Sequence, residues 1–114
     1  MADLIIPIGD QEIKFTVTGS TPVMYMAMHG KDFLSEFLKL EKELNTGEVK
    51  DFMAFYRIAY TLAKKGNPDI PELSEWLDTF EDGFPVFDVV QELMPLIQLN
   101  FQSAKKKNPT TKKK

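Results

Sequence analysis

The stretch EVKDFMAFYRIAYTLAKK, residues 48–65, decides the fold of this chain. Its large apolar residues go around most of a helical circumference, with small alanines between them; they are Val49, Phe52, Met53, Phe55, Tyr56, Ile58, Tyr60 and Leu62. A helix that is apolar on nearly all sides has to be surrounded by other elements. The charges at its ends match a helix dipole, with acidic residues at its start and Lys64 and Lys65 at its end. Gly66 follows as a residue that ends a helix. Residues 48–65 are therefore predicted to form a central helix.

The first eighteen residues predict a β-hairpin over residues 4–18. In the second strand apolar Ile13, Phe15 and Val17 alternate with polar residues, which indicates one buried face. The pair Gly9 and Asp10 is typical of a tight turn that begins with glycine. Two strands alone are only marginally stable, so helices are expected to cover this hairpin.

Four further helices are expected around these elements. Their predicted ranges are about 22–29, 31–44, 70–80 and 85–104, from apolar residues recurring at three- and four-residue spacing. Thr21 is predicted to cap the first of them, with Pro22 at the first helical position. Asp69 and Glu72 form an acidic version of a capping box before 70–80. Pro95 predicts a kink or a restart in the last helix.

The chain therefore predicts an α+β protein, mainly α-helical, with an N-terminal β-hairpin packed on about five helices. One globular domain is expected over residues 1–104, since cores of this size are common, and residues 105–114 are expected to be a disordered, Lys-rich tail. The domain holds 17 acidic and 8 basic residues, a net charge of −9, and the tail adds +6. An acidic body repels phosphates, so nucleic-acid binding is not expected.

The residue content argues against an enzyme and predicts no catalytic, cofactor or metal site. The chain has no cysteine and a single histidine, His29, which leaves few metal ligands and no base for a serine nucleophile. All six glycines stand singly at element boundaries, so no phosphate-binding loop is present. No stretch has the roughly 20 apolar residues of a membrane helix, and no secretory signal is evident. We expect a cytoplasmic protein without membrane contact.

Surplus apolar surface is the main functional signal in the sequence. Met24 and Met28 would share one helix face, and methionines make adaptable contact surfaces. The helices at 31–44 and 85–104 carry more large apolar residues than one small core readily buries, which predicts a partner surface and possible homo-oligomers. The candidate residues are Met24, Met28, Phe33, Phe37, Val90, Met94, Ile97 and Phe101.

The order of these segments resembles a known family. A hairpin is followed by GKDFLSEFLKLEKEL (30–44), an apolar helix, PELSEWLD (71–78) and a long helix with a Lys-rich end. This order is similar to that of the tail assembly chaperones of long-tailed bacteriophages and prophages. The resemblance implies a non-enzymatic cytoplasmic helper that coats the tape measure protein, recruits tail tube subunits and is absent from the mature virion. It also implies a longer product made by ribosomal frameshifting. The slippery sequence that such a shift requires could be the adenine-rich codons of Lys105–Lys107 or of Lys112–Lys114.

Two other functions fit the residues without the resemblance. A small helical adaptor or regulatory protein would need the same apolar surfaces for a different client. A nucleic-acid-associated protein could use the six tail lysines, although a tail without aromatic residues would bind only non-specifically.

Overall fold

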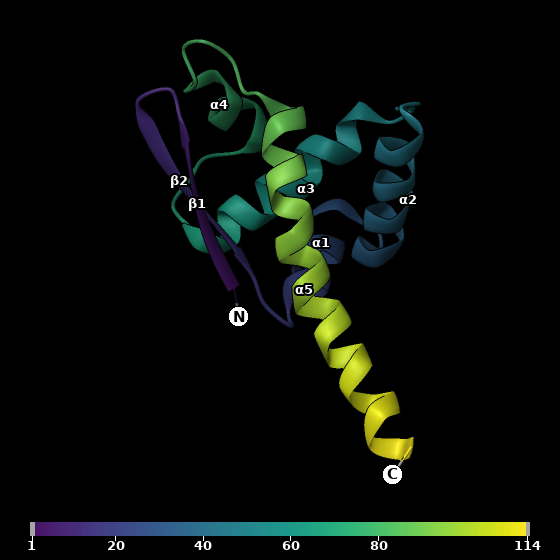
Figure 1. Ribbon diagram of the computed structural model, residues 1–114. Helices are drawn as coiled ribbons and strands as arrows, with labels where there is room; N and C mark the ends of the chain where they lie inside the picture. Colours follow the sequence, from purple (N-terminus) through teal and green to yellow (C-terminus); the bar gives the residue numbers. More distant parts are fainter. Residues whose placement is uncertain (1, 114) are drawn as a thin grey trace.

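The computed structural model describes residues 2–101 with their side chains (Figure 1). An antiparallel hairpin precedes five helices in this part of the chain, which gives the mainly helical α+β fold that the sequence predicts. The elements are β1 (Ala2–Ile8), β2 (Gln11–Val17), α1 (Thr21–His29), α2 (Phe33–Thr46), α3 (Phe52–Gly66), α4 (Leu73–Asp78) and α5 (Val86–Lys113). The predicted disordered tail, residues 105–114, lies outside the described residues.

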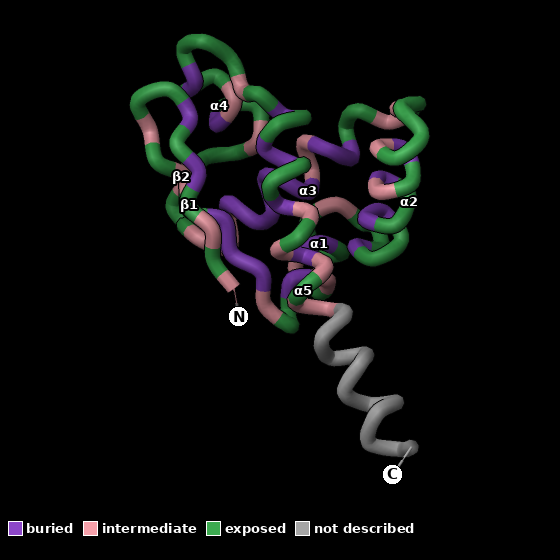
Figure 2. Tube along the Cα trace, viewed as in Figure 1, coloured by how far each residue is buried: buried purple, intermediate pink, exposed green. Residues whose placement is uncertain are grey.

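Helix α3 is the centre of the fold, as its all-round apolar pattern predicts. It packs against β2 and also contacts α1, α2 and α5. Phe55, Ile58 and Leu62 are completely buried, and Figure 2 shows buried segments of the other elements turned toward this helix. The buried side chains of the hairpin and the helices form one cluster around α3. Among the described residues, no helix combines the length and apolar character required to cross a membrane.

The hairpin turns through Gly9 and Asp10, as predicted. Gly9 has a φ of 62°, whereas Asp10, like every other non-glycine residue that the structure describes, lacks a positive φ, so the turn is of type II′. Ile8 lies opposite Gln11 directly beside this two-residue loop. In such a hairpin the flanking pair exchanges hydrogen bonds, and every second pair along the strands does the same. The backbone N–H and C=O groups of Asp3 and Ile5 therefore point away from β2.

Helix α3 closes the outer edge of β2. Lys14 lies opposite Ile5, so its carbonyl points away from β1. A Cβ atom placed on Gly66, the last residue of α3, would lie 2.2 Å from the Lys14 carbonyl oxygen. Only glycine permits this approach between the helix end and the strand.

Several helix starts differ from the prediction. Helix α1 is preceded by Ser20, and Thr21 is its first residue; the Thr21 hydroxyl instead accepts a 2.9 Å hydrogen bond from the Thr18 N–H. Helix α2 begins at Phe33 and not at residue 31, because the Asp32 carboxylate accepts from the Ser35 N–H at 2.9 Å.

Helix α3 begins four residues later than predicted. Its first residue is Phe52, because the Asp51 carboxylate caps the helix by accepting from the N–H groups of Met53 and Ala54. Residues 48–51 precede the helix in extended or irregular conformation. The strong acceptor nearest to the buried apolar run therefore defines the start of α3.

Helices α4 and α5 correct two further predictions. The capping box of Asp69 and Glu72 is wrong, since α4 begins at Leu73 without a side-chain cap. Pro71 explains the delay, because a residue before proline, here Ile70, is disfavoured in helical conformation. Of the kink or restart predicted at Pro95, the restart is wrong, since α5 continues through it. Pro95 lies on the exposed side of α5, where water can satisfy the carbonyl that loses its partner.

Candidate protein-binding groove

An open apolar groove lies between α2 and α5. It has a volume of about 390 Å³, and most of its lining is hydrocarbon. Its lining residues are Leu34, Phe37, Leu38 and Glu41 from α2 and Ile97, Gln98 and Phe101 from α5. Surplus apolar residues of both helices meet solvent in this groove.

Helix α2 presents leucines to solvent because its apolar stripe is wider than its buried face. Phe33, Phe37 and Leu40 share the inner face and are buried. Leu34 and Leu38 each follow one of these phenylalanines, so they lie about 100° further around the helix. Their exposed fractions are 40% and 61%. With a spacing of four residues they form a continuous apolar stripe along one wall of the groove.

Helix α5 supplies the opposite wall as a continuation of the core. Val90, Leu93 and Ile97 are completely buried at three- and four-residue spacing. Phe101 extends this row by one more turn, is half-buried, and its ring centre lies 6.0 Å from that of Phe33. The groove is therefore floored by core side chains that the fold holds in place.

One polar pair joins the two walls. The Gln98 side-chain amide donates a hydrogen bond to the Glu41 carboxylate, which links α5 to α2. Both residues are half-buried at the edge of the apolar lining. The groove therefore combines an apolar floor with a negatively charged group on its rim.

The structure separates the predicted partner-binding residues into three sets. Phe33 and Val90 are completely buried, so the expectation that they lie on a surface is wrong. Phe37, Ile97 and Phe101 come together in the groove, the first two as its floor. The three methionines do not line it: Met24, Met28 and Met94 are half-buried or exposed elsewhere on α1 and α5.

The sequence interpretation missed Leu34 and Leu38 as site residues. Both belong to the apolar pattern that predicted the helix, and two leucines at four-residue spacing beside a complete phenylalanine row were the available signal. The phenylalanine row is enough to form the buried face of α2. The leucine row, Leu34 and Leu38, was therefore the one to assign to the surface.

A buried polar network holds α2 in position behind the groove. The Glu36 carboxylate accepts from the Tyr25 hydroxyl at 2.8 Å and from two nitrogens of the Arg57 guanidinium, at 2.9 and 3.2 Å. Arg57 also donates to Asp51 at 3.1 Å. The network ties α1, α2 and the start of α3 together, and Oε1 of Glu36 alone accepts from Tyr25 and from both Arg57 nitrogens through charge-assisted hydrogen bonds.

The network shifts the titration of its members. Burial alone would raise the pKa of Glu36, but the hydrogen bonds from Tyr25 and Arg57, together with the Arg57 charge, outweigh burial and lower it. Burial and the bond to Glu36 raise the pKa of Tyr25. Arg57 and Glu36 are therefore a charged pair at neutral pH, with a neutral phenol beside them. We assign this network a role in positioning helices.

His29 extends the network at the end of α1. The Thr61 hydroxyl donates to the Arg57 carbonyl at 2.7 Å, so its single proton is used. The hydroxyl can then only accept in its 2.9 Å contact with His29 Nε2, which assigns the proton of a neutral ring to that nitrogen. Burial, and then the positive charge of Arg57, lower the pKa of His29.

We expect His29 to make the stability of the fold depend on pH in mildly acidic solution. Since its pKa in the folded chain lies below the ordinary 6.5, the folded state binds fewer protons than the unfolded state just below that pH. The stability that depends on a neutral His29 is therefore fully present above pH 6.5 and is lost as the pH falls. Denaturant unfolding at several pH values should show this slope for the native chain. The variant His29→Gln should lack it, and an unchanged slope would contradict the assignment.

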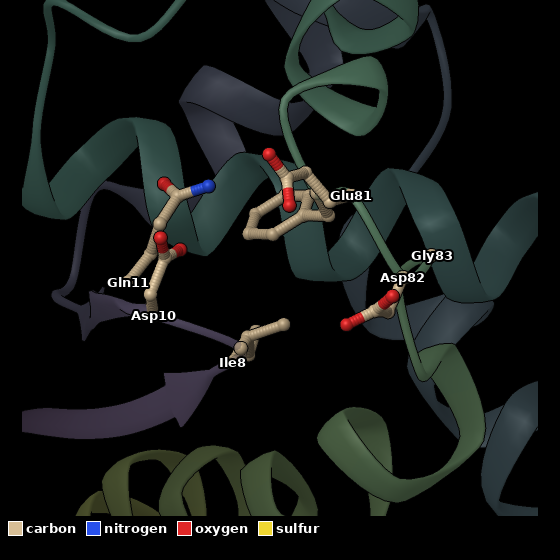
Figure 3. A pocket seen from close by; sticks show the side chains of 8 residues that line it. Ile8, Asp10, Gln11, Glu81, Asp82 and Gly83 are labelled. Carbon is tan, nitrogen blue, oxygen red and sulfur yellow. The ribbon is translucent and has the colours of Figure 1, made fainter.

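A second recess, shown in Figure 3, lies between the hairpin turn and the segment after α4. Asp10, Glu81 and Asp82 stand around it, and Ile8 forms part of its floor. Gln11 fixes the turn to the end of α4 by donating to the Thr79 carbonyl at 3.1 Å. Among the described residues, no group of three or more histidine or acidic side chains is arranged to hold a metal ion.

A third feature is an exposed aromatic surface where α3 and α5 begin. Phe52 and Phe87 meet edge to face with ring centres 5.5 Å apart, and both are exposed. Phe55 anchors Phe87 from the core at 5.0 Å. We call Phe52 and Phe87 the aromatic surface; it shares no lining residue with the groove.

Comparisons with protein-family models, with curated proteins and with solved structures found no match for this chain. The class that can be stated is therefore the one that the fold defines, a mainly helical α+β protein with an N-terminal hairpin. The similarity to tail assembly chaperones remains a prediction from the sequence.

Proposed function

We propose that this chain is a non-enzymatic tail assembly chaperone that binds a helical segment of a tape measure protein in the groove between α2 and α5. The observation that carries this proposal is the open apolar groove with its exposed Leu34 and Leu38. A soluble protein that keeps such a groove in solvent needs a partner for it. The role also agrees with the order of segments that resembles this family.

The shape of the groove favours a helix as its occupant. Two helices form the walls, and residues four positions apart face the space from each side, Leu34 with Leu38 and Ile97 with Phe101. An amphipathic helix with apolar residues at positions i, i+4 and i+7 fits between such walls. A tape measure protein is a long helical chain that would offer many such segments.

Charge supports a client with basic residues beside its apolar stripe. Residues 1–104 carry a net charge of −9, and Glu41 lies on the rim of the groove. Lysine or arginine next to the apolar stripe of the client would be attracted to this rim. The same acidic exterior keeps a complex with a sticky client soluble and repels nucleic acid.

The proposed role has two further parts. The chaperone recruits tail tube subunits through a surface that the client leaves free, and the aromatic surface is available for this because it lies apart from the groove. It acts in the host cytoplasm and is absent from the mature virion. Mass spectrometry of purified particles from a phage that encodes this chain tests the last statement, which the presence of the chain in stoichiometric amounts would contradict.

We expect Leu38→Glu to weaken client binding at least tenfold. The change places a charge in the middle of the apolar stripe, where burying it without a partner is unfavourable. The measurement is co-purification and titration calorimetry with the tape measure protein encoded nearest to this gene. Because Leu38 is 61% exposed, the free chain should keep its stability.

Val23→Glu is the matched control for this variant. Val23 is also highly exposed but lies on α1, outside the groove, so the control should bind the client as the native chain does. Equal binding by both variants would contradict the groove assignment. No binding of the tape measure protein by the native chain, with binding of unrelated amphipathic helices, would favour a general helical adaptor.

A further inference from the structure

The hairpin leaves one sheet edge open. The end of α3 closes the outer edge of β2, where Gly66 meets Lys14. On β1 the backbone groups of Asp3 and Ile5 point outward, and no helix or loop within residues 2–101 donates to or accepts from them. The Ile5 side chain beside them is 57% exposed. An unpaired edge with an exposed β-branched residue is suited to accept another strand.

We propose that β1 pairs antiparallel with β1 of a second copy of this chain, with Ile5 opposite Ile5 of the other copy. Each Ile5 would then donate to and accept from its counterpart, and each Asp3 N–H would donate to the Pro7 carbonyl opposite it. Four hydrogen bonds result from a single twofold arrangement. Two marginal hairpins would become one four-stranded sheet. This inference is independent of the groove and of the proposed client.

Pro7 and Asp3 together select this register. Pro7 has no N–H, and its place in β1 puts its nitrogen on the open edge, where no bond within the hairpin is lost. If Ile5 of one copy faced Pro7 of the other, the missing Pro7 N–H would stand opposite the Ile5 carbonyl, and hydrogen bonds would be lost. If Ile5 instead faced Asp3 of the other copy, the two Asp3 carboxylates would lie about 7 Å apart, against about 13 Å when Ile5 faces Ile5.

The outward face of the strand tolerates the pairing. The Asp3 carboxylate already has local partners, since it accepts from the Thr16 hydroxyl at 2.8 Å and lies 3.8 Å from the Lys14 ammonium. Leu4 and Ile6 alternate with Ile5 and face the helices, so they would lie opposite each other on the covered side of the larger sheet. The exposed Ile5 side chains would be covered by one another.

Sedimentation equilibrium over a wide concentration range tests the proposal. The native chain should approach twice its monomer mass, and Ile5→Pro should lower the association constant by about 30-fold, because two hydrogen bonds are lost. Proline is tolerated there by the monomer, since the Ile5 N–H has no partner within the hairpin. Far-ultraviolet circular dichroism confirms that each variant is folded.

A pair of charge variants tests the register. Ile5→Lys and Ile5→Glu should each be monomeric, because like charges would lie directly opposite, and an equimolar mixture should restore dimers. Leu38→Glu is the control and should leave the dimer intact. A native chain that stays monomeric at every concentration would overturn the proposal. So would an association constant that Ile5→Pro leaves unchanged, or a mixture of folded charge variants that does not associate.

Discussion

Replacing Gly66 with alanine should destabilise the folded chain by about 3 kcal/mol, although alanine is the better helix former. The added Cβ would lie 2.2 Å from the Lys14 carbonyl oxygen and 3.2 Å from the Thr16 hydroxyl. Both neighbours belong to β2, whose position is fixed by the hairpin and the core, so α3 has to move away from the strand. The expected result is a large decrease in the free energy of unfolding, measured with denaturant.

Gly19→Ala is the matched control for this variant. Gly19 has no atom within 4 Å of an added Cβ and lacks a positive φ, so alanine fits there without strain. The substitution should leave stability unchanged or raise it by up to about 1 kcal/mol through the unfolded state. If Gly66→Ala also raised stability, the close contact between α3 and β2 would be wrong.

Glu36→Ala should cost about 4 kcal/mol, the range found when one partner of a buried ion pair is removed. The side chains of Glu36 and Arg57 are only 10% and 14% exposed, so the remaining guanidinium charge would be poorly solvated. The Tyr25 hydroxyl, which is buried, would lose its acceptor as well. Thermal and denaturant unfolding measure this effect, and a weakened helix α2 should also loosen the groove.

Two comparisons distinguish this effect from a general loss of charge. Lys14→Ala removes the exposed pair with Asp3 and should change stability by less than about 1 kcal/mol. The double variant Glu36→Leu with Arg57→Met should recover much of the lost stability, because the buried pair is removed together and Asp51, which loses Arg57, is 31% exposed and keeps Lys39 nearby. Equal effects of Glu36→Ala and Lys14→Ala would show that the buried network contributes little.

The sequence was sufficient for the features that depend on local periodicity. The central position of α3 follows from apolar residues around most of its circumference, which a helix packed on one face alone would leave in solvent. The hairpin turn follows from Gly9 at a position that requires a positive φ. These features need no knowledge of distant neighbours, and the structure has them where the pattern puts them.

The ends of the helices were predicted less well, because several residues competed for the same role. The apolar pattern of α3 already begins at Val49, but the Asp51 carboxylate adjacent to the buried run caps the helix. Asp69 had the right spacing for a cap, but Pro71 keeps the preceding residue out of the helix. Such competition is decided by backbone geometry and packing, which a linear pattern does not contain.

The candidate site required tertiary information. Phe33 and Leu34 are neighbours in an apolar stripe, and the packing of α2 against α1, α3 and α5 decides that the first is buried and the second lines the groove. The partners Glu36 and Arg57 are 21 residues apart on different helices, so no local spacing marks them as a pair. The sequence could therefore predict surplus apolar surface on α2 and α5, but not which side chains form it.

The central position of α3 also determines when this protein can fold during its synthesis. The hairpin leaves the ribosome before the helices, yet its inner face is covered by α3 and by α5. A nascent chain that ends at Gly66 lacks the buried Val90, Leu93 and Ile97, so its core is incomplete. Folding therefore waits until α5 has left the ribosome. A protein proposed to protect another chain from aggregation has a short unprotected interval of its own.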